Sequence, residues 1–312
     1  MKPFNWNGLP ISRIAMGCEP LGGTDWGVID LSLVRRAVAA ALDVGVTVFD
    51  TADVYGLGRS EEELSAALGV RRKDAFIITK FGVRWENESA GGRARTFKDS
   101  SPSYLAKALE GSLKRLRIDA IPLYLVHWPD QATPIDDTLA ALEDARQSGK
   151  ILNFGLSNFD ANTVSAASSR NISALEGPYS LLRQDGAETA FKAAREAGLA
   201  CVAYGPLAQG LLTGKYAKSS RFESNDRRNR LAQFDPGQWE ANARILARLE
   251  DVARKREKKI AEVAVRWVLD SGLIDIAVVG AKSPEQMIEN AGVLNWTLTD
   301  EEVADLSQSL GS

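Results

Sequence analysis

Four residues of types suited to proton transfer each follow a short, mostly apolar stretch of the chain: Asp50, Tyr55, Lys80 and His127, the only histidine. An aspartate can hold a lysine in place and keep it charged, and a lysine cation lowers the pKa of a neighbouring phenol from its usual value of about 10. We therefore expect Tyr55 to act as a general acid toward an oxygen that gains charge, and His127 to orient that oxygen. The pattern predicts reduction of a carbonyl group.

Each of these residues alone has an ordinary structural interpretation. An aspartate or lysine at a strand end is commonly a cap or a solvated charge, a single histidine is commonly structural, and a tyrosine there commonly packs the rim. The occurrence of all four types after successive strands favours a functional site. Because none of these side chains can supply a hydride, a reductase built on them needs a nicotinamide cofactor.

The segments that carry these residues repeat one unit, which is a helix, a glycine and a short apolar strand. A glycine just past a helix end supplies the left-handed backbone conformation that closes the helix. Such junctions indicate parallel strands joined by right-handed crossovers. We predict eight inner strands near residues 14–17, 46–49, 75–79, 121–126, 151–156, 173–177, 199–204 and 276–279, with five preceding helices closed by Gly45, Gly69, Gly149, Gly198 and Gly272.

Helix starts are marked as well. Ser60 with Glu63 has the pattern of a capping box, and Ser101-Pro102 places proline at a first helical position. Strands and helices in this alternation predict an α/β fold, a closed (β/α)8 TIM barrel. In such a barrel the carboxyl ends of all strands meet at one open face, where active sites are built.

Further elements extend the predicted barrel. An Asn-Gly pair between two alternating runs within residues 4–14 predicts an N-terminal β-hairpin, and residues 299–310 predict an extra C-terminal helix. Two polar segments, residues 82–100 and 208–239, are too long for simple connections. We expect these segments to form functional lids.

Composition bounds the class of protein. The chain has 312 residues, of which 45% are hydrophobic, and its net charge of −3 gives no reason to expect a nucleic acid or an anionic membrane as partner. Two distant cysteines, Cys18 and Cys201, are typical of reduced thiols rather than of a disulfide framework. Without an apolar run that suits a signal peptide or a bilayer span, we expect a cytoplasmic protein with one barrel domain over residues 1–312, as a monomer or a weak homo-oligomer.

Several motifs together resemble the aldo-keto reductase family. They are FDTADVYG at 49–56, ITKF at 78–81, LVHWPD at 125–130, GLSNF at 155–159, and the segments 203–216 and 280–290. The resemblance implies the tetrad described above, an NADPH cofactor with NADH as the alternative, and three sets of cofactor-binding residues. Ser157, Asn158, Glu176 and Tyr204 would hold the nicotinamide; Gly205, Pro206, Leu207, Gln209, Gly210 and Lys215 the pyrophosphate; Gly280, Lys282, Gln286, Glu289 and Asn290 the adenosine end.

The sequence departs from the family pattern at three positions. Glu176 replaces the usual glutamine, and a carboxylate can accept from the carboxamide nitrogen of nicotinamide but cannot donate to its oxygen. Gly205 replaces a common serine. Gln286 stands where many members carry an arginine for the 2′-phosphate, although Lys282 can supply a cation there.

The substrate is expected to be a small aldehyde, ketone or keto-sugar. Trp26, Trp85 and Trp128 would wall an aromatic pocket, with Cys18 and Glu19 near its floor. Three arginines in the polar segment after the third strand would suit a sugar or phosphate, or else a solvated lid: Arg84, Arg93 and Arg95.

Three alternatives remain to be weighed against a reductase. The first is an NADPH-binding, redox-sensing accessory protein with little turnover, which resembles potassium-channel β subunits. The second is a metal-dependent hydrolase that uses Asp50, Asp53 and His127, but such sites usually gather more histidines, so we expect no metal. The third is a Rossmann dinucleotide-binding site, because residues 56–61 begin like its glycine fingerprint. This interpretation fails, since Glu61 takes the place of the third glycine.

Overall fold

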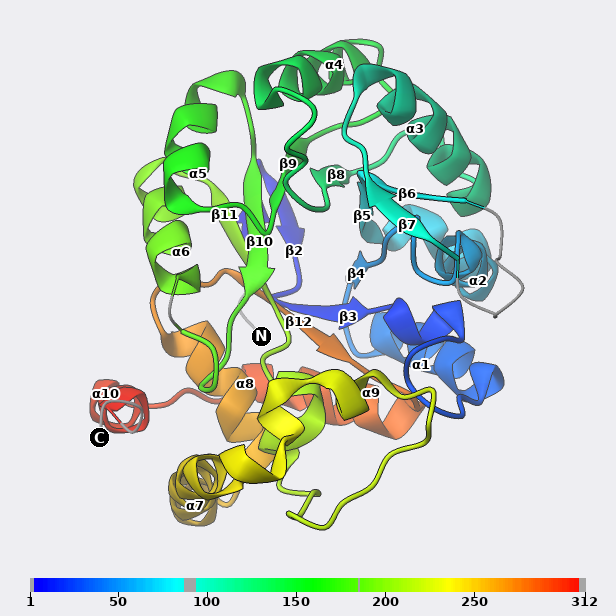
Figure 1. Cartoon of the computed structure of the whole chain (residues 1–312). Coiled ribbons are helices and arrows are strands. Elements are labelled where there is room, and N and C mark those ends of the chain that lie inside the picture. Colours follow the sequence, from blue (N-terminus) through cyan, green and yellow to red (C-terminus); the bar gives the residue numbers. More distant parts are fainter. Residues whose placement is uncertain (1–2, 87–93, 185, 309–312) are drawn as a thin grey trace.

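The computed structural model describes residues 3–86, 94–184 and 186–308. Eight parallel strands pair in sequence order, and β12 pairs with β3, so that the sheet closes into a barrel (Figure 1). This architecture confirms the predicted (β/α)8 barrel. Its strands are β3 (Ile14–Gly17), β4 (Val48–Asp50), β5 (Phe76–Phe81), β8 (Leu123–Val126), β9 (Phe154–Ser157), β10 (Ala174–Pro178), β11 (Ala200–Tyr204) and β12 (Ile276–Gly280).

Helices surround the barrel on all sides (Figure 1). Those of the repeating units are α1 (Leu31–Asp43), α2 (Arg59–Leu68), α3 (Pro102–Leu116), α4 (Ile135–Gln147), α5 (Ala161–Ala167), α6 (Ala187–Glu196), α8 (Ile260–Asp270) and α9 (Pro284–Gly292). Two helices are additional. The helix α7 (Trp239–Arg256) precedes and packs against α8, and α10 (Asp300–Gln308) is the predicted C-terminal helix, whose expected last residues lie outside the described part.

The sequence signals at the helix ends predicted the glycine junctions and the Ser101 cap correctly, but they predicted one capping box wrongly. The junction glycines have the expected left-handed backbone, with φ of 80° at Gly45 and 78° at Gly149. Ser101 caps α3 by accepting from the Tyr104 backbone N–H. The predicted capping box at Ser60 is wrong, because α2 begins at Arg59 after Gly58, and the Ser60 hydroxyl is used elsewhere.

The strands alternate between two hydrophobic clusters. In β4, Val48 faces the interior of the barrel and Phe49 faces the helices. In β5, Ile78 faces the interior and Ile77 faces the helices. Successive side chains of a strand point to opposite faces, so residues two positions apart share a face. The next inward position after Val48 is therefore Asp50, at the carboxyl end of the barrel.

Two antiparallel hairpins flank the barrel. The predicted N-terminal hairpin is present as β1 (Phe4–Trp6) and β2 (Leu9–Ile11), and its Trp6 packs against Phe76 of the barrel floor at 5.1 Å between ring centroids. The polar segment after β5 contains a second hairpin, β6 (Val83–Trp85) and β7 (Thr96–Lys98), which the sequence did not predict. Arg93 lies outside the described residues.

The second long segment, residues 208–239, links β11 to α7 and is called the strap from here on. It folds into short 3₁₀ helices rather than an open loop, including η4 (Ala208–Thr213) and η5 (Arg227–Arg230). Tyr216, Phe222 and Phe234 pack edge to face, with centroid distances of 5.0 to 5.9 Å, and give the strap a small core of its own. In Figure 1 the strap is the light green to yellow ribbon, and its η4 packs against α8.

Two smaller expectations concern the cysteines and the membrane. Cys18 and Cys201 are both buried and free, as predicted. Within the described part of the chain, no helix has the length and apolar character that a membrane span requires.

Candidate active site

The alternation of the strands gathers polar side chains at the carboxyl end of the barrel. Asp50, Lys80 and His127 each lie two positions after the last apolar residue that faces the barrel interior, on β4, β5 and β8 respectively. The equivalent inward positions of β9, β10 and β11 carry Ser157, Glu176 and Tyr204. Residues from across the sequence thus meet at a single rim.

Lys80 is held between carboxylates below this rim. Its Nζ donates to Asp50 Oδ2 at 2.5 Å and to the Thr51 carbonyl oxygen at 3.1 Å, and lies 3.3 Å from Glu176 Oε1. The Lys80 side chain is only 1% exposed. Burial lowers the pKa of this ammonium, but Asp50 and Glu176 raise it, and the net shift is well above the usual value. Lys80 therefore stays charged.

Tyr55 is positioned by two loops that touch. The loop after β3, with η1 (Glu19–Gly22), rests on the loop after β4. A Cβ at Gly56, where φ is 60°, would lie 2.3 Å from the Gly22 carbonyl oxygen, and a Cβ at Gly22 would lie 2.9 Å from the Tyr55 carbonyl carbon. Ser60 Oγ ties the same loops by donating to the Cys18 carbonyl oxygen at 2.7 Å. Only glycine fits at this contact, which fixes the Tyr55 backbone.

The Tyr55 ring lies between Lys80 and His127. Lys80 Nζ is 5.6 Å from the Tyr55 ring centroid, and the His127 ring meets it edge to face at 5.8 Å. Burial raises the pKa of the phenol; Lys80 lowers it, Asp50 raises it, and the net shift is well upward. Our expectation of a lowered pKa is therefore wrong for the protein alone, because burial and the carboxylates outweigh the cation.

His127 is held as a neutral imidazole. Burial, with a smaller contribution from the Lys80 charge, lowers its pKa well below the usual value. The His127 backbone N–H donates to the Phe81 carbonyl oxygen, and the His127 carbonyl oxygen accepts from Asn158 Nδ2 at 2.9 Å. Among the described residues, no hydrogen-bond partner is found for His127 Nδ1. Hydrogen bonds of the His127 backbone therefore position the ring, and its Nδ1 is available to bond to a ligand.

The residues expected at a nicotinamide form one connected network. Asn158 adopts a left-handed backbone with φ of 67°, which turns its side chain toward its neighbours. Its Nδ2 donates to Ser157 Oγ at 3.0 Å, and its Oδ1 accepts from the Tyr204 hydroxyl at 2.7 Å. Glu176 is 1% exposed, and its Oε2 has no hydrogen-bond partner in the described part of the chain. The contact between Glu176 and Lys80 was not foreseen.

The residues expected at an adenosine lie together around the start of α9. Gln286 Oε1 accepts from the Lys282 backbone N–H at 2.8 Å, and Asn290 Nδ2 donates to the Gly280 carbonyl oxygen at 3.4 Å. Glu289 instead pairs with Lys259, the residue before α8. The Lys282 cation and the amino end of α9 make this end of the site suited to an anion.

The strap closes over the loop after β3 through charged contacts. Arg227 Nη1 donates to Glu19 Oε1 at 2.5 Å, and its backbone N–H donates to the Asp25 carbonyl oxygen at 2.9 Å. Trp26 lies beneath two cations, with the Arg227 guanidinium 5.7 Å and Lys282 Nζ 5.4 Å from its rings. Sequence reasoning missed Arg227, since its partner stands 208 positions away and no motif marks it.

The residues expected at the pyrophosphate lie just before the strap and in its first turns. Gly205, Gln209 and Gly210 all have positive φ, of 69°, 53° and 96°, so the chain turns tightly there. Pro206 and Leu207 lie between β11 and η4, and Lys215 is exposed just after η4.

The three tryptophans of the expected substrate pocket separate in the structure. Trp128 stacks beside His127 at 6.2 Å between ring centroids, with Lys98 Nζ 5.5 Å from its own ring. Trp85 lies at the end of β6, and Trp26 lies under the strap as described. Trp128 therefore lies directly beside a tetrad residue.

The described arginines of the polar segment have partners of their own. Arg84 Nε lies 3.4 Å from Asp99 Oδ2, and the guanidiniums of Arg84 and Arg95 stand over the Phe97 ring at 4.9 and 4.7 Å. They belong to the second hairpin and its surroundings.

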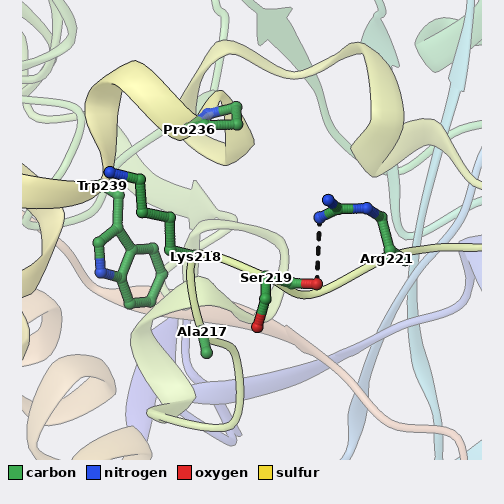
Figure 2. A pocket seen from close by; sticks show the side chains of 6 residues that line it. All are labelled: Ala217, Lys218, Ser219, Arg221, Pro236 and Trp239. Atoms are coloured by element: carbon green, nitrogen blue, oxygen red, sulfur yellow. Dashed lines mark hydrogen bonds between the residues drawn. The ribbon is translucent and has the colours of Figure 1, made fainter.

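A separate hollow of about 590 Å³ lies on the strap itself. Figure 2 shows its lining, in which Lys218 stands near Trp239, whereas Arg221 lies on the opposite side and donates to the Ser219 carbonyl oxygen. None of the tetrad residues lines this hollow. It is a surface feature apart from the barrel mouth.

The described residues fit a nicotinamide dinucleotide. Unpartnered buried polar atoms, Glu176 Oε2 and His127 Nδ1, lie at the barrel mouth, where the polar head of the molecule would bind. Lys282 and the start of α9 lie at the other end, where its phosphates and adenosine would bind. In the described ranges, no group of three or more His, Cys, Asp or Glu residues is arranged to hold a metal ion.

A closed α/β barrel with a buried carboxylate, ammonium and imidazole and a half-buried phenol at its mouth defines an oxidoreductase that works on carbonyl groups or alcohols. The chain belongs to the aldo/keto reductase family, whose model matches residues 13–310. This family generally uses NAD(P)H and acts on small carbonyl substrates.

Individual relatives agree with this assignment. Aldo-keto reductase YhdN of Bacillus subtilis is 33% identical over 97% of this chain and 91% of its own, and aldo-keto reductase yakc [NADP(+)] of Schizosaccharomyces pombe is 31% identical over 96% and 88%. Among solved structures, the glycerol dehydrogenase AKR11B4 from Gluconobacter oxydans aligns with a TM-score of 0.89 at 36% identity, over 97% of this chain and 92% of that one. The holo form of aldo-keto reductase AKR11C1 from Bacillus halodurans aligns at 0.81 and 28% identity, over 99% and 96%.

Proposed function

We propose that this protein is an NADPH-dependent reductase of small aldehydes, ketones or keto-sugars, with Tyr55 as the general acid. The observation that carries the proposal is the buried ion pair of Asp50 and Lys80 beneath a tyrosine whose ring also meets His127. A buried pair of this kind is costly to desolvate, and such a cost is typical of functional sites.

The four residues have distinct roles in this proposal. When bound, the nicotinamide supplies the hydride. Tyr55 keeps its proton in the resting protein because its pKa is raised, and it gives that proton to the carbonyl oxygen as the oxygen gains charge. Lys80, fixed by Asp50, stabilises the phenolate that remains, and His127 as a neutral imidazole offers a hydrogen bond that orients the carbonyl group.

NADPH is proposed over NADH on two grounds. Lys282 stands two residues before α9, and its ammonium, which donates to the Trp26 carbonyl oxygen at 3.0 Å, supplies a cation that would suit a 2′-phosphate. Gln286 is already bonded to the Lys282 backbone. The fission yeast relative also carries NADP(+) in its name. Ser157, Asn158, Glu176 and Tyr204 would hold the nicotinamide end, and the start of the strap would cover the pyrophosphate.

The substrate would enter beside Trp128. This ring is partly exposed, at 37%, and stacks on His127, so it forms one wall of the approach to Tyr55. The similarity to a glycerol dehydrogenase supports small hydroxylated substrates such as a hydroxyaldehyde or hydroxyketone.

The alternative is a protein that binds NADPH and reports its redox state with little turnover. A steady-state assay separates the two functions: a panel of small aldehydes, ketones and keto-sugars is offered with NADPH and, separately, with NADH. Carbonyl-dependent oxidation that is faster with NADPH supports the reductase. Tight binding of NADPH without oxidation by any carbonyl in the panel would favour the sensor.

A further inference from the structure

The cation of the tetrad is shared by two carboxyl groups. Lys80 Nζ lies 2.5 Å from Asp50 on β4 and 3.3 Å from Glu176 on β10, on the far side of the barrel from β5. The side chains of Asp50, Lys80 and Glu176 are 6%, 1% and 2% exposed. With His127 neutral, two ionised carboxylates would leave an uncompensated negative charge in a buried site, which is unfavourable.

One of the two carboxyl groups therefore holds a proton, and the distances identify it. Asp50 is the closer partner of Lys80 and forms the ion pair, whereas Glu176 contacts the same ammonium at longer range. Burial, followed by the charge of Asp50, raises the pKa of Glu176 to about 8, in agreement with this assignment. A carboxylic acid at Glu176 is thus the form that fits this geometry at neutral pH.

We propose that Glu176 distinguishes the two redox forms of the bound cofactor by changing its charge, being neutral beside the reduced nicotinamide and ionised beside the oxidised one. The inference rests on the proposed function, which places the nicotinamide ring next to Tyr55. The oxidised ring carries a positive charge that the reduced ring lacks. Binding of NADP⁺ then releases the Glu176 proton to solvent, while binding of NADPH does not, so charge and protons balance.

The size of the effect follows from electrostatics. A unit positive charge about 6 Å from a carboxylate, at the effective dielectric constant of about 20 that suits protein sites, gains on the order of 10- to 100-fold in affinity. By linkage, NADP⁺ lowers the pKa of Glu176 by the same factor that ionised Glu176 raises the affinity for NADP⁺. The ratio of the two dissociation constants therefore becomes pH-dependent.

Other titratable groups around Glu176 do not share this behaviour. Tyr55 and Lys80 have pKa values raised well above their usual range, burial raises the pKa of Tyr204 on β11 to about 12, and burial lowers that of His127. Asp50 is paired with Lys80. Lys282 and the 2′-phosphate meet both redox forms alike, so they cancel in the ratio.

Glu19 on η1 is a further carboxyl group at the mouth, and it receives its own control. Burial raises its pKa, although Arg227 opposes the shift. The variant Glu19→Gln therefore tests whether Glu19 contributes to any pH dependence that is observed.

The experiment measures the dissociation constants of NADP⁺ and NADPH by quenching of tryptophan fluorescence at pH 6.5 and 9.5. For the wild type, we expect the ratio of the NADPH constant to the NADP⁺ constant to rise about tenfold or more with pH. For Glu176→Gln, the ratio should change less than about twofold, whereas Glu19→Gln should keep the wild-type rise of this ratio with pH. Calorimetric titration of the wild type with NADP⁺ at pH 7, in two buffers of different ionisation enthalpy, should show release of a large fraction of a proton.

Each outcome has a definite meaning. If neither nucleotide binds at any pH, the proposed function falls before this inference is reached. If both bind but the wild-type ratio is flat, or Glu176→Gln shows the same rise, Glu176 is not the group and the inference is overturned. If Glu176→Gln does not fold, the proton release by the wild type decides: a value near zero overturns the inference.

Discussion

The barrel mouth and the strap both depend on ion pairs, but the two pairs differ in kind. Asp50 and Lys80 are 6% and 1% exposed and project from neighbouring strands of the barrel. Glu19 and Arg227 are 28% and 33% exposed and join a short 3₁₀ helix to the strap. The same chemistry is therefore used once inside the protein and once near its surface.

The contrast between the two pairs predicts which parts of the site are fixed and which can open. Removing one partner of a buried pair leaves an uncompensated charge and costs far more than the pair itself contributes. A partly exposed pair contributes little and weakens with salt. We therefore expect the proposed reacting groups to be held rigidly, and the contacts of the strap over the proposed cofactor site to be weak enough to break during turnover.

The largest effect on stability is expected from Lys80→Met. This change leaves Asp50 and Glu176 buried without their cation, and we expect the free energy of unfolding to fall by about 3–5 kcal/mol. The matched control is Lys150→Met, which removes the exposed pair with Glu110, where the side chains are 47% and 59% exposed. The control should cost less than about 1 kcal/mol in denaturant titration. Equal losses in the two variants would remove the distinction between buried and exposed pairs.

A smaller effect that depends on pH is expected from Glu176→Gln. The folded-state pKa of Glu176, about 8, exceeds the ordinary value of 4.5, so its contribution to stability is full below about pH 4.5 and is lost as the pH rises through 8. The variant has no such proton. Relative to Glu176→Gln, the wild type should lose on the order of a few kcal/mol of unfolding free energy between pH 5 and pH 9. A difference that is constant with pH would contradict the assignment.

A kinetic effect is expected from Arg227→Met. Loss of the pair with Glu19 should speed dissociation of NADPH by about two- to fivefold and make it less sensitive to salt, with little change in thermal stability. Stopped-flow displacement at low and high salt measures both quantities. Arg221→Met is the control, since Arg221 bonds to backbone oxygens within the strap. If this control released NADPH as quickly, the Glu19 pair would have no special part in closure.

The smallest expected change is an absence of titration at His127. Because burial holds its pKa well below 6.5, the imidazole should stay neutral from pH 8 down to about 6. As the chain has a single histidine, its imidazole resonance in nuclear magnetic resonance spectra is unambiguous. A midpoint near 6.5 in the folded protein would show that the mouth is more hydrated than its geometry indicates.

Much of the barrel could be predicted from the sequence because its signals are local. Glycine after a helix and a short apolar run after the glycine mark five of the units, and closure of the barrel then brings Asp50, Lys80 and His127 to one rim. Because side chains alternate between the two faces of a strand, these three side chains point into the barrel.

The parts that could not be predicted depend on contacts across the barrel or on burial. Glu176 and Lys80 lie on strands that are not neighbours, so no short motif predicts their contact. The direction of the Tyr55 pKa shift depends on how much water reaches the ring, which a sequence does not give. Ser60 matched a capping pattern, yet its hydroxyl serves a contact between two loops.

The most direct test of the central claim is turnover by Tyr55→Phe compared with the wild type, with NADPH and with NADH, on the best carbonyl substrate of the panel. The phenylalanine keeps the ring that packs against His127 and Lys80 but has no proton to give. We expect the rate to fall by about a thousandfold or more, within the range of general acid catalysis, while the dissociation constant of NADPH is kept. An unchanged rate would contradict the role of Tyr55 and, with it, the proposed mechanism.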